Sequence, residues 1–163
     1  MNCFRSLSVC LILLGAAPRV SSACTTFLLE QEGAVVGKSY DWDEDNALVS
    51  INKRGVAKQA MLLSQSSPLS WTSEFASVTF NQYGCQFPNS GMNEAGLVVE
   101  IMWLDGTVYP SADQRMAVNE LQWVQWAVDN HATVAELVEV APTIRVEQAF
   151  AEVHYLACDT SMA

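Results

Sequence analysis

The chain has 163 residues, of which 50% are hydrophobic and 16% are charged. This balance fits one globular domain and excludes an intrinsically disordered chain, which has low hydrophobicity and many charges. The formal net charge of −10 argues against nucleic acid and anionic membranes as partners.

Residues 1–23 have the layout of a cleavable secretory signal. The apolar run Leu7–Ala17 is too short to span a bilayer as a helix, and small residues at Ser21–Ala23 precede Cys24. We therefore expect a signal peptide at residues 1–23 and a secreted or periplasmic mature domain at residues 24–163, with no stable membrane insertion after signal removal. An uncleaved membrane anchor is the alternative. Signal removal leaves six basic residues against 18 acidic ones, a formal charge of −12.

Short apolar segments bounded by turn residues predict a series of β-strands. The expected strands are Thr25–Leu29, Ala34–Tyr40, Leu48–Asn52, Gln59–Leu63, Val78–Tyr83, Leu97–Leu104 and Val153–Ala157. The first two form a hairpin around a turn at Glu30–Gly33. Leu97–Leu104 is the most apolar, so its single charge, Glu100, needs a partner if it faces inward.

Two helices are expected between the later strands. Val118–Val128 has amphipathic spacing, and Thr133 with Glu136 forms a capping box for a second helix that ends at Pro142. Strands followed by helices indicate an α+β fold with a largely antiparallel sheet. The sequence ends directly after an apparent strand, which predicts a fragment of a larger domain.

The expected mature chain contains three cysteines, Cys24, Cys85 and Cys158. An odd number in an oxidising compartment leaves at least one thiol free or paired outside the chain. Cys85 and Cys158 are the two that could pair with each other. No CxxC motif occurs and the chain has only two histidines, so we expect no metal site.

A cysteine at a new amino terminus combines a nucleophile and a base in one residue. Its α-amino group titrates near pH 8, so a useful fraction is neutral and can accept the thiol proton. Cys24 is therefore the candidate nucleophile. The alternatives are a lipoprotein cysteine, although Ser21 stands where that signal has an apolar residue, and a plain structural cysteine.

The predicted hairpin returns Lys38 and Asp41 towards Cys24. Asp41 is suited to hold the α-ammonium, and Lys38 is suited to lower the pKa of the thiol. A solvated turn is the alternative for both. Farther along, Asn93 lies in a predicted tight turn between strands, where an asparagine can be purely structural or can aim a donor at an oxyanion.

Three ordered motifs carry a resemblance to a known family. They are CTTF at Cys24–Phe27, GKSYDWD at Gly37–Asp43 and GMNEAGL at Gly91–Leu97. The chain resembles the choloylglycine hydrolases and penicillin V acylases, which are linear amide C–N hydrolases of the N-terminal nucleophile superfamily. This resemblance implies an αββα sandwich with antiparallel sheets, here incomplete, as in a carboxyl-truncated member.

The resemblance also implies roles for individual residues. Cys24 is the nucleophile and Asp41 holds its α-amine, while Lys38 stands where the family usually has an arginine and lacks the planar fork of donors. Trp103 falls at a family position that helps to form the oxyanion hole. The family's second oxyanion asparagine and a late arginine would follow beyond Ala163.

The resemblance predicts a hydrolase that cleaves non-peptide linear amides of the bile-salt, penicillin V or N-acyl type through a cysteine thioester. The expected partner is a small amide with an apolar acyl group; no metal or organic cofactor is needed, and oligomerisation is left open. Aromatic and methionine residues form either an acyl pocket or simply core: Trp42, Trp71, Met92, Met102 and Trp103. The alternatives are a non-catalytic truncated secreted domain of this fold and a lipid-anchored envelope protein.

Overall fold

The protein is described from a computed structural model that covers residues 24–30 and 34–161. Its main sheet has five strands in the order β11-β8-β7-β6-β3, and every neighbouring pair is antiparallel. These strands are β3 (Leu48–Asn52), β6 (Ser77–Asn81), β7 (Pro88–Asn93), β8 (Val98–Trp103) and β11 (Val153–Cys158). The expected signal peptide and the loop of the predicted Glu30–Gly33 turn lie outside the described residues.

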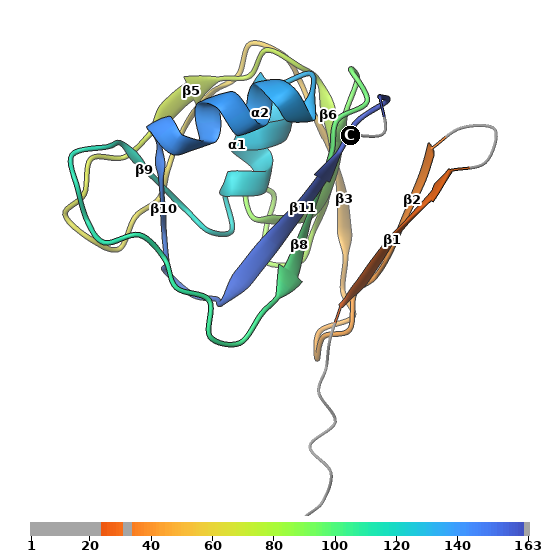
Figure 1. The fold of residues 1–163 in the computed structure, drawn as a ribbon, viewed down its shortest axis with the longest axis horizontal. Helices are drawn as coiled ribbons and strands as arrows, with labels where there is room; N and C mark the ends of the chain where they lie inside the picture. The colour runs from red at the N-terminus through yellow and green to blue at the C-terminus, as the bar shows by residue number, and fades with distance from the viewer. Residues whose placement is uncertain (1–23, 31–33, 162–163) are drawn as a thin grey trace, which may run out of the picture.

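Two helices cover one face of this sheet (Figure 1). Helix α1 (Trp123–Asn130) packs against β7 and β8, and seven of its eight residues are buried. Helix α2 (Val134–Val140) follows, with a short 3₁₀ turn, η1 (Ala141–Thr143), after it. Because α1 is buried on nearly all sides, its polar residues need internal partners. Asp129 has them: it accepts bonds from the indole of Trp71 and from Gln125 and pairs with Lys58 at 2.7 Å.

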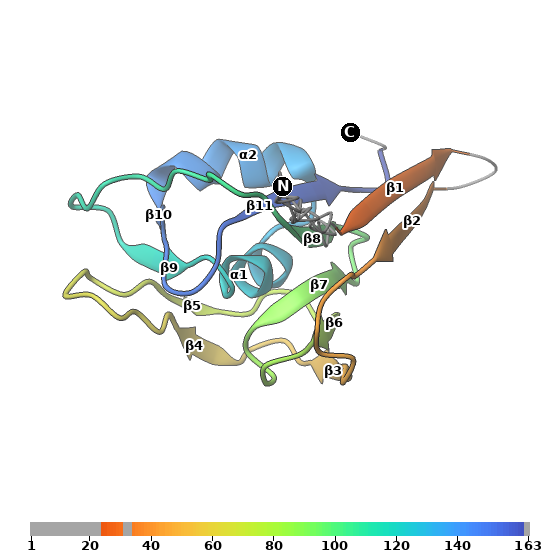
Figure 2. The same ribbon diagram turned by 90° about the horizontal axis from the view of Figure 1, so that it is seen from below.

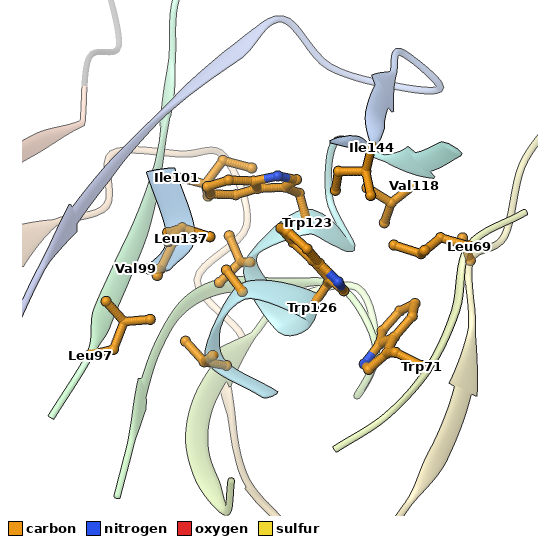
Figure 3. Close-up of a cluster of buried hydrophobic side chains, with 14 of the residues drawn as sticks. Leu69, Trp71, Leu97, Val99, Ile101, Val118, Trp123, Trp126, Leu137 and Ile144 are labelled. Atoms are coloured by element: carbon orange, nitrogen blue, oxygen red, sulfur yellow. The ribbon is translucent and has the colours of Figure 1, made fainter. Parts of the chain in front are cut away.

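The hydrophobic core fills the space between the sheet and α1 (Figure 3). Leu97, just before β8, and Val99 and Ile101 within it point towards α1, and the residues between them face the other side of the sheet, as the period of two in a strand requires. Helix α1 contributes Trp123 and Trp126, which lie 6.0 Å apart between ring centroids.

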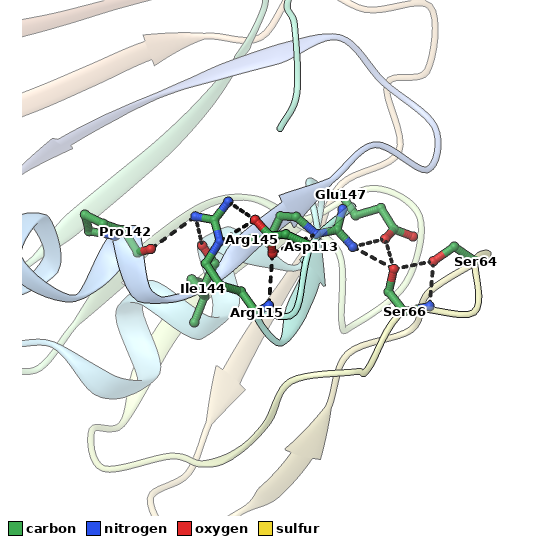
Figure 4. A network of polar contacts seen from close by, with 8 residues as sticks. All are labelled: Ser64, Ser66, Asp113, Arg115, Pro142, Ile144, Arg145 and Glu147. Atoms are coloured by element: carbon green, nitrogen blue, oxygen red, sulfur yellow. Dashed lines mark hydrogen bonds and ion pairs between the residues drawn. The ribbon is translucent and has the colours of Figure 1, made fainter. Parts of the chain in front are cut away.

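Two smaller pairs of strands extend this core. They are the antiparallel pair β4 (Ala57–Gln59) and β5 (Ser70–Thr72), and the parallel pair β9 (Ala117–Asn119) and β10 (Arg145–Glu147). Buried Arg145 joins these outer parts, bonding Ser66 and Glu147 at 2.6 Å each (Figure 4). The network keeps the outer layer in register around the helices.

A separate hairpin lies on the side of the sheet opposite the helices (Figures 1 and 2). It pairs β1 (Thr25–Glu30) with β2 (Ala34–Ser39). The sheet face on this side carries exposed apolar side chains on β3 and β6, including Ile51 at 81% and Phe80 at 48%. The hairpin covers only part of this face.

The α+β prediction and the largely antiparallel sheet are confirmed, and the β9–β10 pair is parallel. The strands expected at the start of the chain, at Leu48–Asn52, in Leu97–Leu104 and at Val153–Ala157 all form within a residue or two of their predicted bounds. The described residues contain one helical layer, the main sheet and the hairpin of the αββα arrangement. In this described part, no helix has the length and apolar character to cross a membrane.

Two expected elements are wrong. The helix expected at Val118–Val128 begins only at Trp123, because the preceding β9 pairs with β10 and the Asn119 side chain accepts bonds from the amides of Leu121 and Gln122. The strand expected at Gln59–Leu63 does not form beyond β4. The amide and carbonyl of Met61 bond instead to the side chains of Gln122 and Asn119.

The second helix begins as its capping box predicts. Thr133 accepts a bond from the Glu136 amide at 3.2 Å, and the Glu136 carboxylate reaches back to the amide of Ala132 at 2.7 Å. Strands β5, β7, β9 and β10 were not predicted. The first, third and fourth have only three residues each, too few for a period of two to be recognised.

Buried His131 predicts a dependence of stability on pH. Its ring lies against Trp126 and the carbonyl of Ala127, and burial lowers its pKa below the ordinary 6.5. The unfolded chain therefore takes up a proton before the folded one, so the free energy of unfolding should fall as the pH drops below 6.5 and then level off below the folded-state pKa. Urea denaturation over this range should show a flatter dependence of the free energy of unfolding on pH for His131→Gln than for the wild-type protein. An unchanged slope in His131→Gln would contradict the assignment.

Candidate active site

Cys24 lies immediately before β1, where the hairpin meets the main sheet. Thr25 pairs with Ser39 across the hairpin, so Tyr40 follows directly opposite Cys24. Cys24 is a half-buried free thiol, and Cys85 and Cys158 are free as well, one exposed and one buried. Cys85 and Cys158 are thus not paired with each other in this structure.

Lys38 attaches the hairpin to the main sheet. Its ammonium donates to the carbonyls of Asn89 at 2.8 Å and Ile101 at 2.6 Å and pairs with Glu100 at 3.2 Å. The side chains of Lys38 and Glu100 are only 9% and 6% exposed. Glu100, whose charge needed a partner, therefore has one, and Ser90 adds a bond to its other oxygen at 2.6 Å.

Opposing effects act on the pKa of Lys38. Burial lowers its pKa, while Glu100 and the nearby Cys24 act in the other direction. The ammonium of Lys38 donates to two carbonyls and forms an ion pair with Glu100, so Lys38 acts on Cys24 through its positive charge. Its expected effect on the pKa of the Cys24 thiol stays a prediction.

The segment after β2 is tied to the loop that follows β6. The hydroxyl of Tyr40 donates to Gln82 at 2.8 Å, and the indole of Trp42 donates to the hydroxyl of Tyr83 at 2.5 Å. Burial raises the pKa of Tyr40 above its ordinary range, so its hydroxyl remains protonated and able to donate. These bonds place residues 40–42 beside the thiol.

An apolar cavity of about 460 Å³ opens beside Cys24. Its walls come from the segment after β2, the loop after β6, strand β8, the turn before α1 and the loop before β11. The lining residues are Cys24, Tyr40, Trp42, Tyr83, Phe87, Asn89, Ile101, Met102, Trp103, Leu121, Phe150, Ala151 and Val153. The volume and the aromatic lining are those of a small-molecule site. Of the five aromatic and methionine candidates, Trp42, Met102 and Trp103 line it, whereas Trp71 belongs to the core and Met92 lies on the exposed sheet face.

Asp41 follows β2 by two residues, at the end of the hairpin where β1 starts. It is exposed and accepts a bond from Ser39 at 2.6 Å. Since Ser39 pairs with Thr25, Asp41 follows the end of β2 that neighbours Cys24. Its expected role towards the α-amine requires cleavage before Cys24 and stays a prediction.

Asn93 does not reach the cavity. It lies at the far end of β7, it is 2% exposed, and its amide donates to the carbonyls of Val128 and His131. Its oxygen accepts bonds from the amides of Ala95 and Leu97. The proposed oxyanion role therefore does not agree with the structure, which favours the alternative of a turn residue that also anchors α1.

Trp103 lines the cavity with its ring and stacks near Trp42, with 5.4 Å between the ring centroids. Its indole N–H points elsewhere, because it donates to the carboxylate of Asp105 at 2.5 Å. In this arrangement Trp103 forms a wall of the cavity, and an oxyanion donor role would require that bond to break.

Several residues of the site were missed from the sequence. Tyr83, Phe87, Leu121 and Phe150 reach the cavity from three separate loops. No local pattern marks them, since their convergence depends on the sheet order. Glu100, in contrast, was marked by the sequence, because a single charge in an apolar strand needs a buried counter-charge.

No family model matches the chain. Penicillin V acylase from Pectobacterium atrosepticum is 28% identical over 151 residues, which cover 82% of this chain and 38% of that protein. The solved penicillin V acylase from Agrobacterium tumefaciens superposes with a TM-score of 0.71 at 28% identity, covering 85% of this chain and 44% of that one. A conjugated bile acid hydrolase from Clostridium perfringens, at 15% identity and a TM-score of 0.68, shares the fold over 86% of this chain and 46% of its own.

These similarities define the class of protein: the chain has the fold of the N-terminal nucleophile hydrolases. Within that class it is similar to penicillin V acylases, at 28% identity to each of the two reported above, in agreement with the resemblance that its motifs carry. The chain spans less than half the length of the relatives it matches.

The four bonds of Asn93 predict a structural variant. Asn93→Ala leaves buried carbonyls and amides without partners, so we expect the free energy of unfolding to fall by about 3 kcal/mol in urea denaturation. Exposed Asn46→Ala is the control and should change it by less than about 0.5 kcal/mol. A stable Asn93→Ala variant that loses only catalytic activity would restore the oxyanion role.

The buried Lys38–Glu100 pair predicts strong energetic coupling. Lys38→Met leaves the Glu100 carboxylate buried without its cation, so we expect a loss of about 3 kcal/mol in the free energy of unfolding. The double variant Lys38→Met with Glu100→Gln should lose less free energy of unfolding than Lys38→Met alone. The exposed pair of Arg54 and Glu94 is the matched control, and Arg54→Met should lower the free energy of unfolding far less than Lys38→Met does, because water screens an exposed pair. Equal losses in Lys38→Met and the double variant would show that the pair does not couple.

Proposed function

We propose that the protein hydrolyses linear amides that carry an apolar acyl group, with Cys24 as the nucleophile. The observation that carries this proposal is the position of the Cys24 thiol on the wall of the apolar cavity. An acyl chain in this cavity would have its carbonyl carbon at the rim, within reach of the sulfur. The names of the relatives, a penicillin V acylase and a conjugated bile acid hydrolase, support acyl transfer from such substrates.

The proposed reaction begins after cleavage before Cys24, in a secreted or periplasmic protein. The new α-amine takes the thiol proton, and the Asp41 carboxylate orients the amine. The sulfur attacks the amide carbonyl, the C–N bond breaks, and the α-ammonium returns the proton to the leaving amine. Water then hydrolyses the thioester and releases the acid. Lys38 favours the thiolate through its positive charge.

A second candidate function is the binding of apolar ligands without turnover. It is favoured by the occupied donors at Asn93 and Trp103, since neither side chain offers its N–H to an oxyanion in this structure. Release of an amine during incubation separates the two functions, because a binding module would retain the amide unchanged.

The central prediction concerns Cys24 itself. Penicillin V, a conjugated bile salt and an N-acyl homoserine lactone should each be offered to the secreted protein, with amine release as the readout. Cys24→Ala should abolish activity, and Cys24→Ser should lower it by about a hundredfold or more, because an alcohol is a weaker nucleophile than a thiolate. Exposed Cys85→Ser is the matched control and should keep wild-type activity.

Intact mass completes this test. A mass that begins at Cys24 with a free amine agrees with the proposal, whereas a lipid adduct on Cys24 would indicate an anchored envelope protein. Equal rates in wild type and Cys24→Ala, or no amine release from any substrate, would overturn the enzymatic proposal.

A further inference from the structure

We propose that Glu120 is a positioning residue that shapes the cavity for long acyl chains. The inference rests on the proposed function, because it treats the apolar cavity as the site of the acyl group. Glu120 does not itself line the cavity. Its carboxylate binds the backbone of the loop that forms one of the cavity walls.

The carboxylate of Glu120 binds three consecutive backbone amides. One oxygen accepts the amides of Phe150 at 2.6 Å and Ala151 at 2.7 Å, and the other accepts Ala149 at 2.7 Å. The Glu120 residue is fully buried. Hydrogen bonds from amides to a carboxylate are shorter and stronger than those between neutral groups, and here they replace the solvation that a buried anion loses.

Glu120 is itself fixed by the surrounding fold. It follows β9, and its amide donates to the carbonyl of Glu147 at 3.2 Å, which continues the pairing of β9 with β10. Its carbonyl accepts the hydroxyl of Tyr155 on β11 at 2.7 Å. The carboxylate is therefore a rigid point to which the loop between β10 and β11 is attached.

The loop needs such an attachment. Its centre is Ala149-Phe150-Ala151, which has no polar side chain of its own to bind these amides. The Phe150 side chain is 56% exposed, so packing alone does not define its position. Phe150 and Ala151 nevertheless line the cavity, and Leu121, the neighbour of Glu120, lines it as well.

The consequence is a cavity wall that depends on one negative charge. With all three amides held, the Phe150 ring stays at the cavity and adds apolar surface for a long chain. Glutamine in place of Glu120 would turn an NH₂ group towards an amide N–H, so at least one of the three bonds would be lost. The wall would then loosen, and a long chain would lose more contact than a short one.

The test is a comparison of acid binding by calorimetry on the whole mature protein. Dodecanoate and hexanoate serve as long and short probes of the cavity. In Glu120→Gln the preference for dodecanoate over hexanoate should fall about tenfold, with weaker dodecanoate binding as the cause. Glu152→Gln is the matched control, because the Glu152 carboxylate binds the amide of Gly106 at 2.6 Å, outside the loop that lines the cavity, and the variant should keep the preference.

Phe150→Ala separates this role from a general loss of structure. This variant should reduce the preference for dodecanoate over hexanoate while leaving the unfolding midpoint close to wild type. If Glu120→Gln does not fold, Phe150→Ala tests the role of the loop in its place. A folded Glu120→Gln with the wild-type preference overturns the proposal, as does an unchanged preference in Phe150→Ala. Failure of the wild-type protein to bind either acid also overturns it.

Binding and turnover can fail separately. A preference that depends on Glu120 in a protein without amidase activity supports the positioning role and overturns the proposed function. Amide hydrolysis with an unchanged preference in Glu120→Gln does the reverse.

Discussion

The arrangement around Cys24 depends on a buried ammonium. Lys38 is the residue of the hairpin that enters the main sheet, and its bonds to Asn89, Ile101 and Glu100 join the two. Transfer of two charges out of water is unfavourable unless each finds partners. A hairpin displaced from the sheet would separate these partners, so their burial selects one docking geometry. That geometry places Cys24 on the wall of the cavity, which residues of β8 also line.

The same use of buried polar groups recurs elsewhere in the fold. Asn93 anchors α1 to the turn before β8. Asp129 pairs with Lys58 and accepts a bond from Trp71, and Glu120 binds the loop before β11. Each side chain forms hydrogen bonds or ion pairs with buried backbone or charged groups that water would bind in the unfolded chain. Of these residues, Glu120 binds a loop that lines the cavity, so that part of the wall can remain apolar while its backbone amides are satisfied. The apolar lining suits an acyl chain because it offers few competing polar contacts.

Prediction from the sequence succeeded where the signal was local. Strand β3 alternates in burial, and the capping box at Thr133 depends on residues three apart. It failed where distant contacts decide the conformation. Residues 117–119 become a strand through pairing with β10, which begins 28 positions after Ala117 in the chain, at Arg145, and helical spacing alone cannot reveal such a partner. Asn93 was a correct turn residue but a wrong oxyanion candidate, because only the packing of α1 shows what its amide binds.

The sequence by itself determined the α+β class, from the order of its strands and helices, and the resemblance to the penicillin V acylases. It also marked Cys24, Lys38 and Asp41 as candidate residues, because short patterns around a hairpin bring them together. The tertiary structure decided which groups face the thiol and which serve the fold. It paired Lys38 with Glu100, turned the Trp103 indole to Asp105 and brought Phe150 to the cavity through Glu120. The physical reason is that a buried polar group loses its contacts with water and must bind a partner in the protein. Strand order and packing across the whole chain determine which partner lies within reach.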